Sequence, residues 1–169
     1  MLFRSYGFSG VNNEPFSGLY GKYFSEQLER AGVGFSREVE LIKAAHKNNF
    51  FSVAWAMSNE EAARMAAAGA DVIGAMIGVT SGGMSGASKT ISLEEATDAV
   101  RQMIYAAKRE NPDVMVLTHG GPFADPDTAA YSIHNTEAVG YASGSSGERI
   151  PTESAVIETT REFKKISLS

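Results

Sequence analysis

The sequence predicts an α/β fold in which short parallel strands alternate with helices around one sheet. Short apolar runs alternate regularly with longer amphipathic stretches, which is the pattern of successive βα units. The segment 71–77 is a continuous apolar run, as expected of a strand that is covered on both faces. We therefore predict five strands over the 169 residues, each followed by a helix.

The first half of the chain contains two predicted strands and two predicted helices. The strands are expected at 8–13 and 50–55, and the helices at 38–47 and 58–68, with a glycine-rich loop after the first strand. Ser58 and Glu61 have the spacing of a capping box, in which the serine oxygen and the glutamate carboxylate satisfy first-turn amides.

The second half repeats the alternation three times. The expected strands are 71–77, 114–118 and 138–142, and the expected helices begin at Ser92, Asp125 and Pro151. Ser92 repeats the capping box with Glu95. Asp125 is a favourable N-cap because Pro126 can occupy the first helical position.

The composition is that of one ordinary soluble domain, with 43% hydrophobic residues. A net charge of −5 disfavours binding to nucleic acid or to acidic membranes. The absence of cysteine excludes disulfides, thiolate nucleophiles and zinc-thiolate sites. No apolar run approaches the roughly 18 residues of a membrane span, so we expect a cytoplasmic protein without a targeting signal.

Two architectures are compatible with five βα units: a doubly wound open sheet and a portion of an eight-stranded barrel. The glycine and serine clusters favour the barrel because they follow the last three predicted strands. A dinucleotide-binding sheet would normally place its glycine-rich turn after the first strand. Barrel enzymes often build a phosphate site from the loops after their last two strands.

The strand at 114–118 leads directly into His119, Gly120 and Gly121. At the carboxyl end of a barrel strand, a histidine faces the common mouth and is suited to acid–base chemistry. The two glycines permit close backbone approach, so their amides can point at an anion. The alternatives are a histidine bonded to a loop carbonyl and a tight glycine turn.

The next strand leads into a second cluster of small residues: Gly144, Ser145 and Ser146. Together with the glycine pair they suggest a phosphate cradle built from two loops. Glu148 is a candidate catalytic carboxylate, and Arg149 can hold a second anionic group. The two side chains could instead pair with each other or cap the last helix.

Further candidates lie in two other loops. The loop from Thr80 to Lys89 is expected to act as a lid, with ligand-binding positions at Thr80, Ser81, Gly82 and Gly83. A solvated loop is the alternative. Asn13, at the end of the first strand, could orient a substrate, ligate a hydrated Mg²⁺ ion or make a turn. Trp55 and Tyr141 are expected to pack at the barrel mouth.

Four segments, in their order and spacing, resemble the phosphoenolpyruvate hydrolase-like TIM-barrel family along essentially the whole chain. These segments are GFSGVNNEP at 7–15, MIGVTSGG at 76–83, HGGP at 119–122 and GSSGERIP at 144–151. The resemblance implies a single partial barrel domain over 1–169, preceded in the family by about three further βα units. The family pattern has a histidine where this chain has Met76 and an aromatic residue where it has Glu14.

The resemblance implies hydrolysis or lyase-type cleavage of a small phosphorylated or phosphonylated carboxylate. His119 and Glu148 would be the catalytic residues, and a Mg²⁺ cofactor is compatible with this chemistry. The alternative is a non-catalytic module that binds an anion or assembles as a half-barrel, either as a homo-oligomer or with a chain that supplies the missing units.

Overall fold

The structure is a computed structural model that describes residues 2–167. Its centre is a five-stranded sheet in which all neighbouring strands are parallel and follow the order β1-β2-β3-β4-β5. The strands are β1 (Gly10–Asn12), β2 (Phe51–Ala56), β3 (Val72–Met76), β4 (Met115–His119) and β5 (Gly140–Tyr141). The predicted parallel α/β fold is therefore confirmed.

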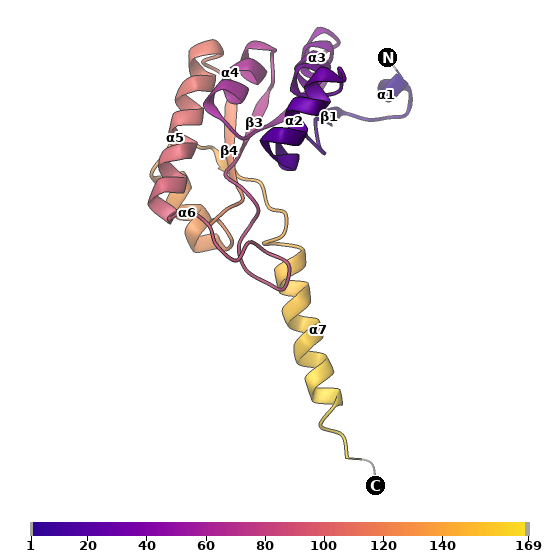
Figure 1. The fold of residues 1–169 in the computed structure, drawn as a ribbon, viewed down its shortest axis with the longest axis vertical. Helices are drawn as coiled ribbons and strands as arrows, with labels where there is room; N and C mark the ends of the chain where they lie inside the picture. Colours follow the sequence, from indigo (N-terminus) through magenta and orange to yellow (C-terminus); the bar gives the residue numbers. More distant parts are fainter. Residues whose placement is uncertain (1, 168–169) are drawn as a thin grey trace.

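Helices connect successive strands and flank the sheet (Figure 1). They are α1 (Leu2–Ser5), α2 (Gly21–Arg30), α3 (Phe35–Lys47), α4 (Asn59–Ala67), α5 (Leu93–Glu110), α6 (Pro126–His134) and α7 (Arg149–Phe163), with a 3₁₀ turn at Ser17–Tyr20. Helix α2 occupies the segment that the sequence predicts as a glycine-rich loop. It has the spacing of an amphipathic helix, with Phe24 and Leu28 four positions apart, but none of its residues is buried.

The strand order decides between the two architectures left open by the sequence. A doubly wound sheet reverses its strand order, and that reversal places helices on both faces. Here the order never reverses, and the core lies on one face of the sheet. In this core, Ala54, Ile73 and Val116 from the strands pack with apolar residues of α3, α4 and α5. The sheet is part of a TIM-barrel-type fold with its helices outside.

The other sheet face corresponds to the inside of a barrel and is less covered. On β2, Ser52, Ala54 and Ala56 are buried, whereas Phe51 is 48% exposed and Trp55 is half-buried. Gly74 on β3 leaves room for the Trp55 ring, because a Cβ atom at position 74 would overlap the six-membered ring of the indole. This face therefore carries the tryptophan that also lines the candidate site.

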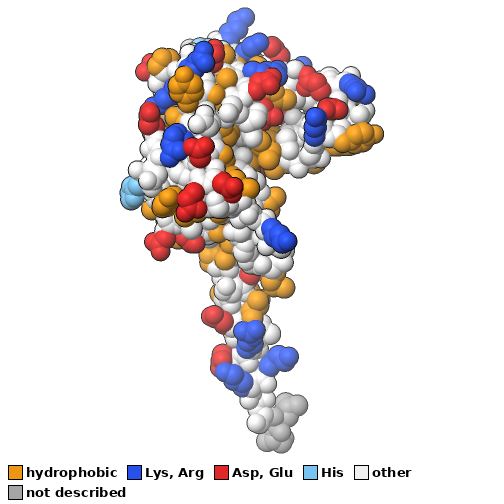
Figure 2. All heavy atoms as spheres, turned by 60° about the vertical axis from the view of Figure 1, so that its left-hand side comes forward, with side chains coloured by type: hydrophobic (Ala, Val, Ile, Leu, Met, Phe, Trp, Pro, Cys, Tyr) orange, Lys and Arg blue, Asp and Glu red, His pale blue; other side chains and the backbone are white. Residues whose placement is uncertain are grey.

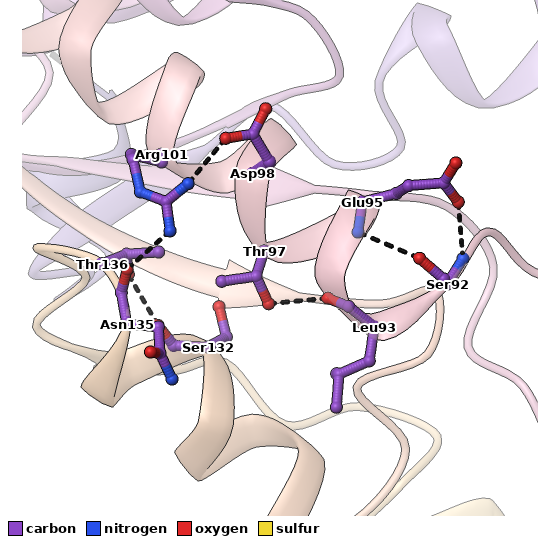
Figure 3. Close-up of polar contacts among 9 residues, drawn as sticks. All are labelled: Ser92, Leu93, Glu95, Thr97, Asp98, Arg101, Ser132, Asn135 and Thr136. Carbon is purple, nitrogen blue, oxygen red and sulfur yellow. Dashed lines mark hydrogen bonds and ion pairs between the residues drawn. The ribbon is translucent and has the colours of Figure 1, made fainter.

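Helix starts follow the capping signals of the sequence in most cases. Ser92 and Glu95 form a complete capping box with distances of 3.1 and 2.9 Å (Figure 3). The Ser58 hydroxyl accepts from the Glu61 amide at 3.1 Å, but the Glu61 carboxylate accepts from the Met57 amide rather than from residue 58. That predicted box is therefore only half formed.

Helices α5 and α6 are tied together near the carboxyl end of α6. Arg101 of α5 donates to the backbone oxygen of Asn135 at 2.9 Å and pairs with Asp98 one turn earlier (Figure 3). On the side of α6 that faces the sheet, the Ser132 hydroxyl donates to the Thr118 hydroxyl of β4 at 3.1 Å. Both residues are fully buried. These contacts fix α6 against β4 and thereby place the loop after β4.

Helix α7 differs from the others because it extends away from the body of the molecule (Figure 1). It begins at Arg149, two residues before the predicted start, with Pro151 in its first turn where a missing amide is tolerated. In the part of the chain that the structure describes, no helix combines the length and the apolar character needed to cross a bilayer.

Candidate functional site

A cavity of about 350 Å³ lies at the carboxyl ends of the strands. Its lining comprises Glu14, Trp55, Met76, His119, Ala142, Ser143, Gly144, Ser145 and Glu148. Each of the five strands contributes, because these residues stand at a strand's carboxyl end or in the loop that follows it. The carboxyl ends of parallel strands meet at one edge, which is where α/β proteins bind ligands.

His119 is the last residue of β4 and is held firmly within this cavity. Its Nδ1 atom lies 2.5 Å from the Ala142 carbonyl oxygen, which follows β5. A carbonyl can only accept, so Nδ1 carries the hydrogen and Nε2 of the neutral ring is left with a lone pair. The fixed tautomer makes Nε2 available as a proton acceptor.

Aromatic rings complete the setting of His119. The Trp55 ring meets the imidazole edge-on at a centroid distance of 4.8 Å, and Tyr141 lies parallel to it at 6.3 Å. Phe16 in turn stacks on Trp55 at 6.3 Å. The Trp55 Nε1 atom is buried and has no hydrogen-bond partner among the described residues. The imidazole therefore sits on an apolar aromatic wall with its polar edge toward the loop after β5.

That loop forms a tight turn around Gly144. The Gly144 carbonyl accepts from the amides of Gly147 and Glu148, both at 3.0 Å, and the Ser145 carbonyl accepts from Ile150 at 2.9 Å. A Cβ atom at position 144 would lie 3.3 Å from Cε1 of His119. The small residue thus lets the turn approach the imidazole, and the turn brings Ser145 and Glu148 to the cavity.

The side chains that line the cavity are acidic, whereas a phosphate-binding site usually contains basic side chains. Two carboxylates, Glu14 and Glu148, line it, whereas no lysine or arginine is found among its described lining residues. A phosphorylated carboxylate would meet these carboxylates unless a cation offsets their charge. Any anionic ligand here therefore requires a companion cation or a protonated imidazole.

The glycine pair after β4 has another environment. The Gly121 amide donates to the Gly78 carbonyl at 3.0 Å, and the Gly121 carbonyl accepts from the Ser81 amide at 2.9 Å. Gly120 has a φ of +76°, and a Cβ atom there would collide with the Gly78 carbonyl oxygen. The pair joins the loops after β3 and β4, and Gly121 lines a separate hollow of about 240 Å³.

Ser145 and Ser146 also point to different places. Ser145 lines the cavity with His119, whereas Ser146 lies 2.8 Å from the Tyr141 hydroxyl and lines a hollow beside α6. The Tyr141 hydroxyl donates to the Phe123 carbonyl at 2.8 Å. The structure therefore does not bring the predicted two-loop cradle of Gly120, Gly121, Ser145 and Ser146 into one pocket.

Arg149 ties α7 to the loop after β3. Its guanidinium donates to the Gly82 carbonyl at 3.0 Å and pairs with Glu153 at 3.1 Å. The Met84 amide donates to Glu153 at 2.7 Å. This amide, and then Arg149, lowers the pKa of the Glu153 carboxyl below its usual value. A Cβ atom at Gly83 would overlap the side chains of Arg149 and Glu153, so a glycine at this position allows the contact between α7 and the loop.

Thr80 and Ser81 are held by backbone contacts of the same loop. Thr80 is buried and its carbonyl accepts from the Ala87 amide at 3.1 Å. Neither Thr80, Ser81, Gly82 nor Gly83 lines the cavity that contains His119. The predicted lid positions thus belong to a loop that is joined to Gly121 and Arg149.

Asn13 is buried and holds the neighbouring strand in place. Its Oδ1 atom accepts from the Trp55 amide at 2.7 Å, while its Nδ2 donates to Glu38 at 2.6 Å and to the Trp55 carbonyl at 3.2 Å. These bonds occupy the polar atoms of its side chain within the protein. Asn13 therefore fixes the cavity wall by holding the backbone at Trp55.

Two cavity residues, Glu14 and Met76, are not among the site residues predicted from the sequence. The signal that could have found them is position, because Met76 ends β3 and Glu14 follows β1. No group of three or more histidine, aspartate or glutamate side chains among residues 2–167 is arranged to hold a metal directly. The carboxylates of Glu14 and Glu148 suit a hydrated Mg²⁺, which binds through one or two carboxylates, water and substrate.

The fold and the cavity define an α/β protein of the TIM-barrel type, with a histidine at the carboxyl edge of its sheet. The chain belongs to the phosphoenolpyruvate hydrolase-like family, whose model matches residues 2–166. This agrees with the resemblance carried by the four sequence segments.

Similar proteins are much longer than this chain. It is 42% identical over 166 residues to the ToMV susceptible protein tm-1(GCR26) and to the ToMV resistance protein Tm-1(GCR237), both of Solanum lycopersicum. These alignments cover 98% of this chain and 22% of each tomato protein. A protein of Sinorhizobium fredii (strain NBRC 101917 / NGR234), y4pA, whose name assigns it provisionally to transcriptional regulation, is 31% identical over 95% of this chain and 26% of its own length.

Proposed function

We propose that the cavity at the strand ends binds a small phosphorylated or phosphonylated carboxylate and that His119 acts on it as a general acid–base. The observation that carries this proposal is the geometry of His119. The contact between Nδ1 and the Ala142 carbonyl leaves Nε2 as the proton acceptor of the neutral ring, and Ser145 and Glu148 line the same cavity as His119. Membership of the phosphoenolpyruvate hydrolase-like family supports the choice of ligand class.

In the proposed hydrolysis, His119 Nε2 accepts a proton from the water that attacks phosphorus. The P–O bond of a phosphate ester or the P–C bond of a phosphonate then breaks, and the imidazolium returns the proton to the leaving oxygen or carbon. In a lyase-type cleavage, the same atom removes the proton of a ligand hydroxyl as the adjacent C–C bond breaks, and it returns that proton to the carbon that keeps the bonding electron pair. Glu148 can orient the imidazolium or the water, because it lines the same cavity. Mg²⁺, when bound, would supply the charge neutralisation that the ligand needs beside Glu14 and Glu148.

The test is a binding and turnover assay on the purified chain. Thermal unfolding is measured with phosphate, phosphoenolpyruvate and phosphonopyruvate, each with and without Mg²⁺, and phosphate release from the two acids is followed in parallel. We expect the acids to raise the melting temperature more with Mg²⁺ than without it. No thermal shift and no release under either condition would refute the proposal.

A second candidate, from a different class, is a non-catalytic module that assembles with another chain. It is favoured by the uncovered inner face of the sheet, on which Phe51 is 48% and Met115 is 41% exposed. Both outer strands, β1 and β5, also pair on one side only among the described residues. A ligand-insensitive protein whose melting temperature depends on its own concentration would favour this candidate.

A further inference from the structure

We infer that the ligand of the cavity at the strand ends carries a protonated amino group in addition to its phosphate or phosphonate and its carboxylate. The inference rests on the proposed function, because it defines more narrowly the class of ligand that the same cavity takes. The ammonium group contacts the carboxylates of Glu14 and Glu148, and the Ser145 hydroxyl donates to the anionic end of the ligand.

The first observation is that the charged side chains of the cavity have no partner within the protein. Among residues 2–167, the carboxylates of Glu14 and Glu148 take part in no hydrogen bond and no ion pair. Two other carboxylates near this edge of the sheet are engaged. Glu38 accepts from Asn13 at 2.6 Å, and Glu153 pairs with Arg149 at 3.1 Å. The two carboxylates of the cavity are therefore available to a ligand.

The second observation is the kind of hydrogen bond that the cavity offers. An ionised carboxylate can only accept, which applies to Glu14 and Glu148. Nε2 of His119 is also an acceptor, because Nδ1 donates to the Ala142 carbonyl. The ionised oxygens of a phosphate or carboxylate are acceptors too and cannot bond to these groups. An ammonium group has three donors and no acceptor, so it complements them.

The third observation is that the acidic character is local to the cavity. Lysine and arginine side chains lie among aspartate and glutamate side chains on the molecular face drawn in Figure 2. In contrast, no described lysine or arginine lines the cavity. Arg149 is next to Glu148 in the sequence, but its guanidinium is bound to the Gly82 carbonyl and to Glu153. The cavity therefore favours a ligand that brings its own positive charge.

An amino group on the ligand suits the cavity with fewer protein groups than a metal ion needs. Mg²⁺ requires near-ideal octahedral coordination, whereas an ammonium group needs only acceptors within hydrogen-bond distance. A cavity of about 350 Å³ is at the small end of the range for small-molecule sites. We therefore expect a small zwitterionic acid whose ammonium group supplies the charge that the proposed function otherwise assigns to Mg²⁺.

The test compares two ligands that differ at one group. Phosphoserine has an ammonium group on the carbon where 3-phosphoglycerate has a hydroxyl. Calorimetric titration of the purified chain at neutral pH, with a chelator present, should show about five- to tenfold tighter binding of phosphoserine. The preference should fall as salt is added, because the carboxylates are exposed. Equal affinities, or a preference that salt does not change, would overturn the inference.

Variants show whether the preference comes from the two carboxylates. Glu14→Gln/Glu148→Gln should bind the two ligands equally. The matched control is Glu60→Gln/Glu94→Gln, which removes two exposed carboxylates from the first turns of α4 and α5, outside the cavity. It changes the net charge by the same amount and should keep the preference. Circular dichroism verifies that both variants are folded. A preference that persists in the first variant, or that disappears equally in the control, would contradict the inference.

Phosphonopyruvate with Mg²⁺, titrated in the same series, separates this inference from the proposed function. If phosphonopyruvate binds but phosphoserine is not preferred over 3-phosphoglycerate, the inference is wrong and the proposed function stands. If none of the three ligands binds under either condition, the proposed function is refuted, and the inference is refuted with it.

Discussion

The turns after β4 and β5 have similar sequences but different tasks. Both contain two glycines and follow a strand that ends at the same edge of the sheet. The turn after β4 uses Gly120 and Gly121 to join two loops through backbone contacts, whereas the turn after β5 uses Gly144 to approach His119 and open a cavity. The comparison shows that a glycine cluster indicates close backbone approach but does not reveal what is approached.

The largest expected effect is a difference in stability between matched glycine substitutions in the two turns. Gly120→Ala would place a Cβ atom against the Gly78 carbonyl at a φ of +76°, so we expect a loss of about 3 kcal/mol in the free energy of unfolding. Gly144→Ala meets only Cε1 of His119 at 3.3 Å and should cost less than about 1 kcal/mol. Urea unfolding measures both, and equal losses would remove the distinction.

The second effect concerns the histidine between the two turns. His119→Asn should lower phosphate release from the preferred acid by about a hundredfold, because a general acid–base contributes at least that factor. The matched control is His134→Asn, the same change at an exposed residue of α6. Its turnover should equal that of the natural protein. Equal rates for the two variants would deny His119 its role.

The two adjacent serines of the turn after β5 should have smaller effects, and these should differ in kind: one on ligand binding and one on stability. Ser145→Ala removes a hydroxyl that lines the cavity and should weaken phosphonopyruvate binding by about five- to tenfold. Ser146→Ala removes the contact with the Tyr141 hydroxyl and should lower stability by about 1 kcal/mol without changing affinity. Calorimetric titration and urea unfolding would contradict this assignment if the two outcomes were exchanged.

The smallest effect is the pH dependence of the tie between α7 and the loop after β3. The pKa of Glu153 is lowered in the folded protein, by the Met84 amide first and Arg149 second. The ionised carboxylate therefore contributes stability above its unfolded pKa, and this contribution is lost as the pH falls through the lowered value.

Glu153→Gln isolates this contribution. The natural protein should be more stable than the variant near pH 7, and the difference should shrink at an acidic pH below the ordinary pKa of glutamate. Urea midpoints at the two pH values provide the measurement. A difference that grows on acidification would mean that the carboxylate is not stabilised by these contacts.

Much of the fold could be predicted because periodicity and capping act locally. The five apolar runs became the five strands, and Ser92 and Asp125 cap their helices as expected. Helix α2 was missed because Gly18 and Gly21 indicate a loop, although Phe24 and Leu28 have the four-residue spacing of one side of a helix. The outward direction of α7 depends on Arg149 and Gly82, which are 67 positions apart, so no local signal contains it.

The candidate site was predictable only in part for the same reason. The end of β4 indicates His119, but whether a loop amide is available to a ligand depends on distant partners such as Gly78. Asn13 is a polar residue at a strand end, as a ligand-binding residue would be, yet its partners are Glu38 and the backbone of Trp55. Residue type and strand position thus predict which edge of the sheet carries the site. Which residues line the cavity depends on their contacts in the folded protein.

The placement of Trp55 gives the protein an intrinsic optical probe. It is the only tryptophan of the chain, so all indole emission comes from the wall of the candidate cavity. Its ring is confined over Gly74 and against the imidazole of His119, which restricts its motion. Changes in the colour or intensity of that emission would therefore report occupancy of the cavity in real time, without any attached dye.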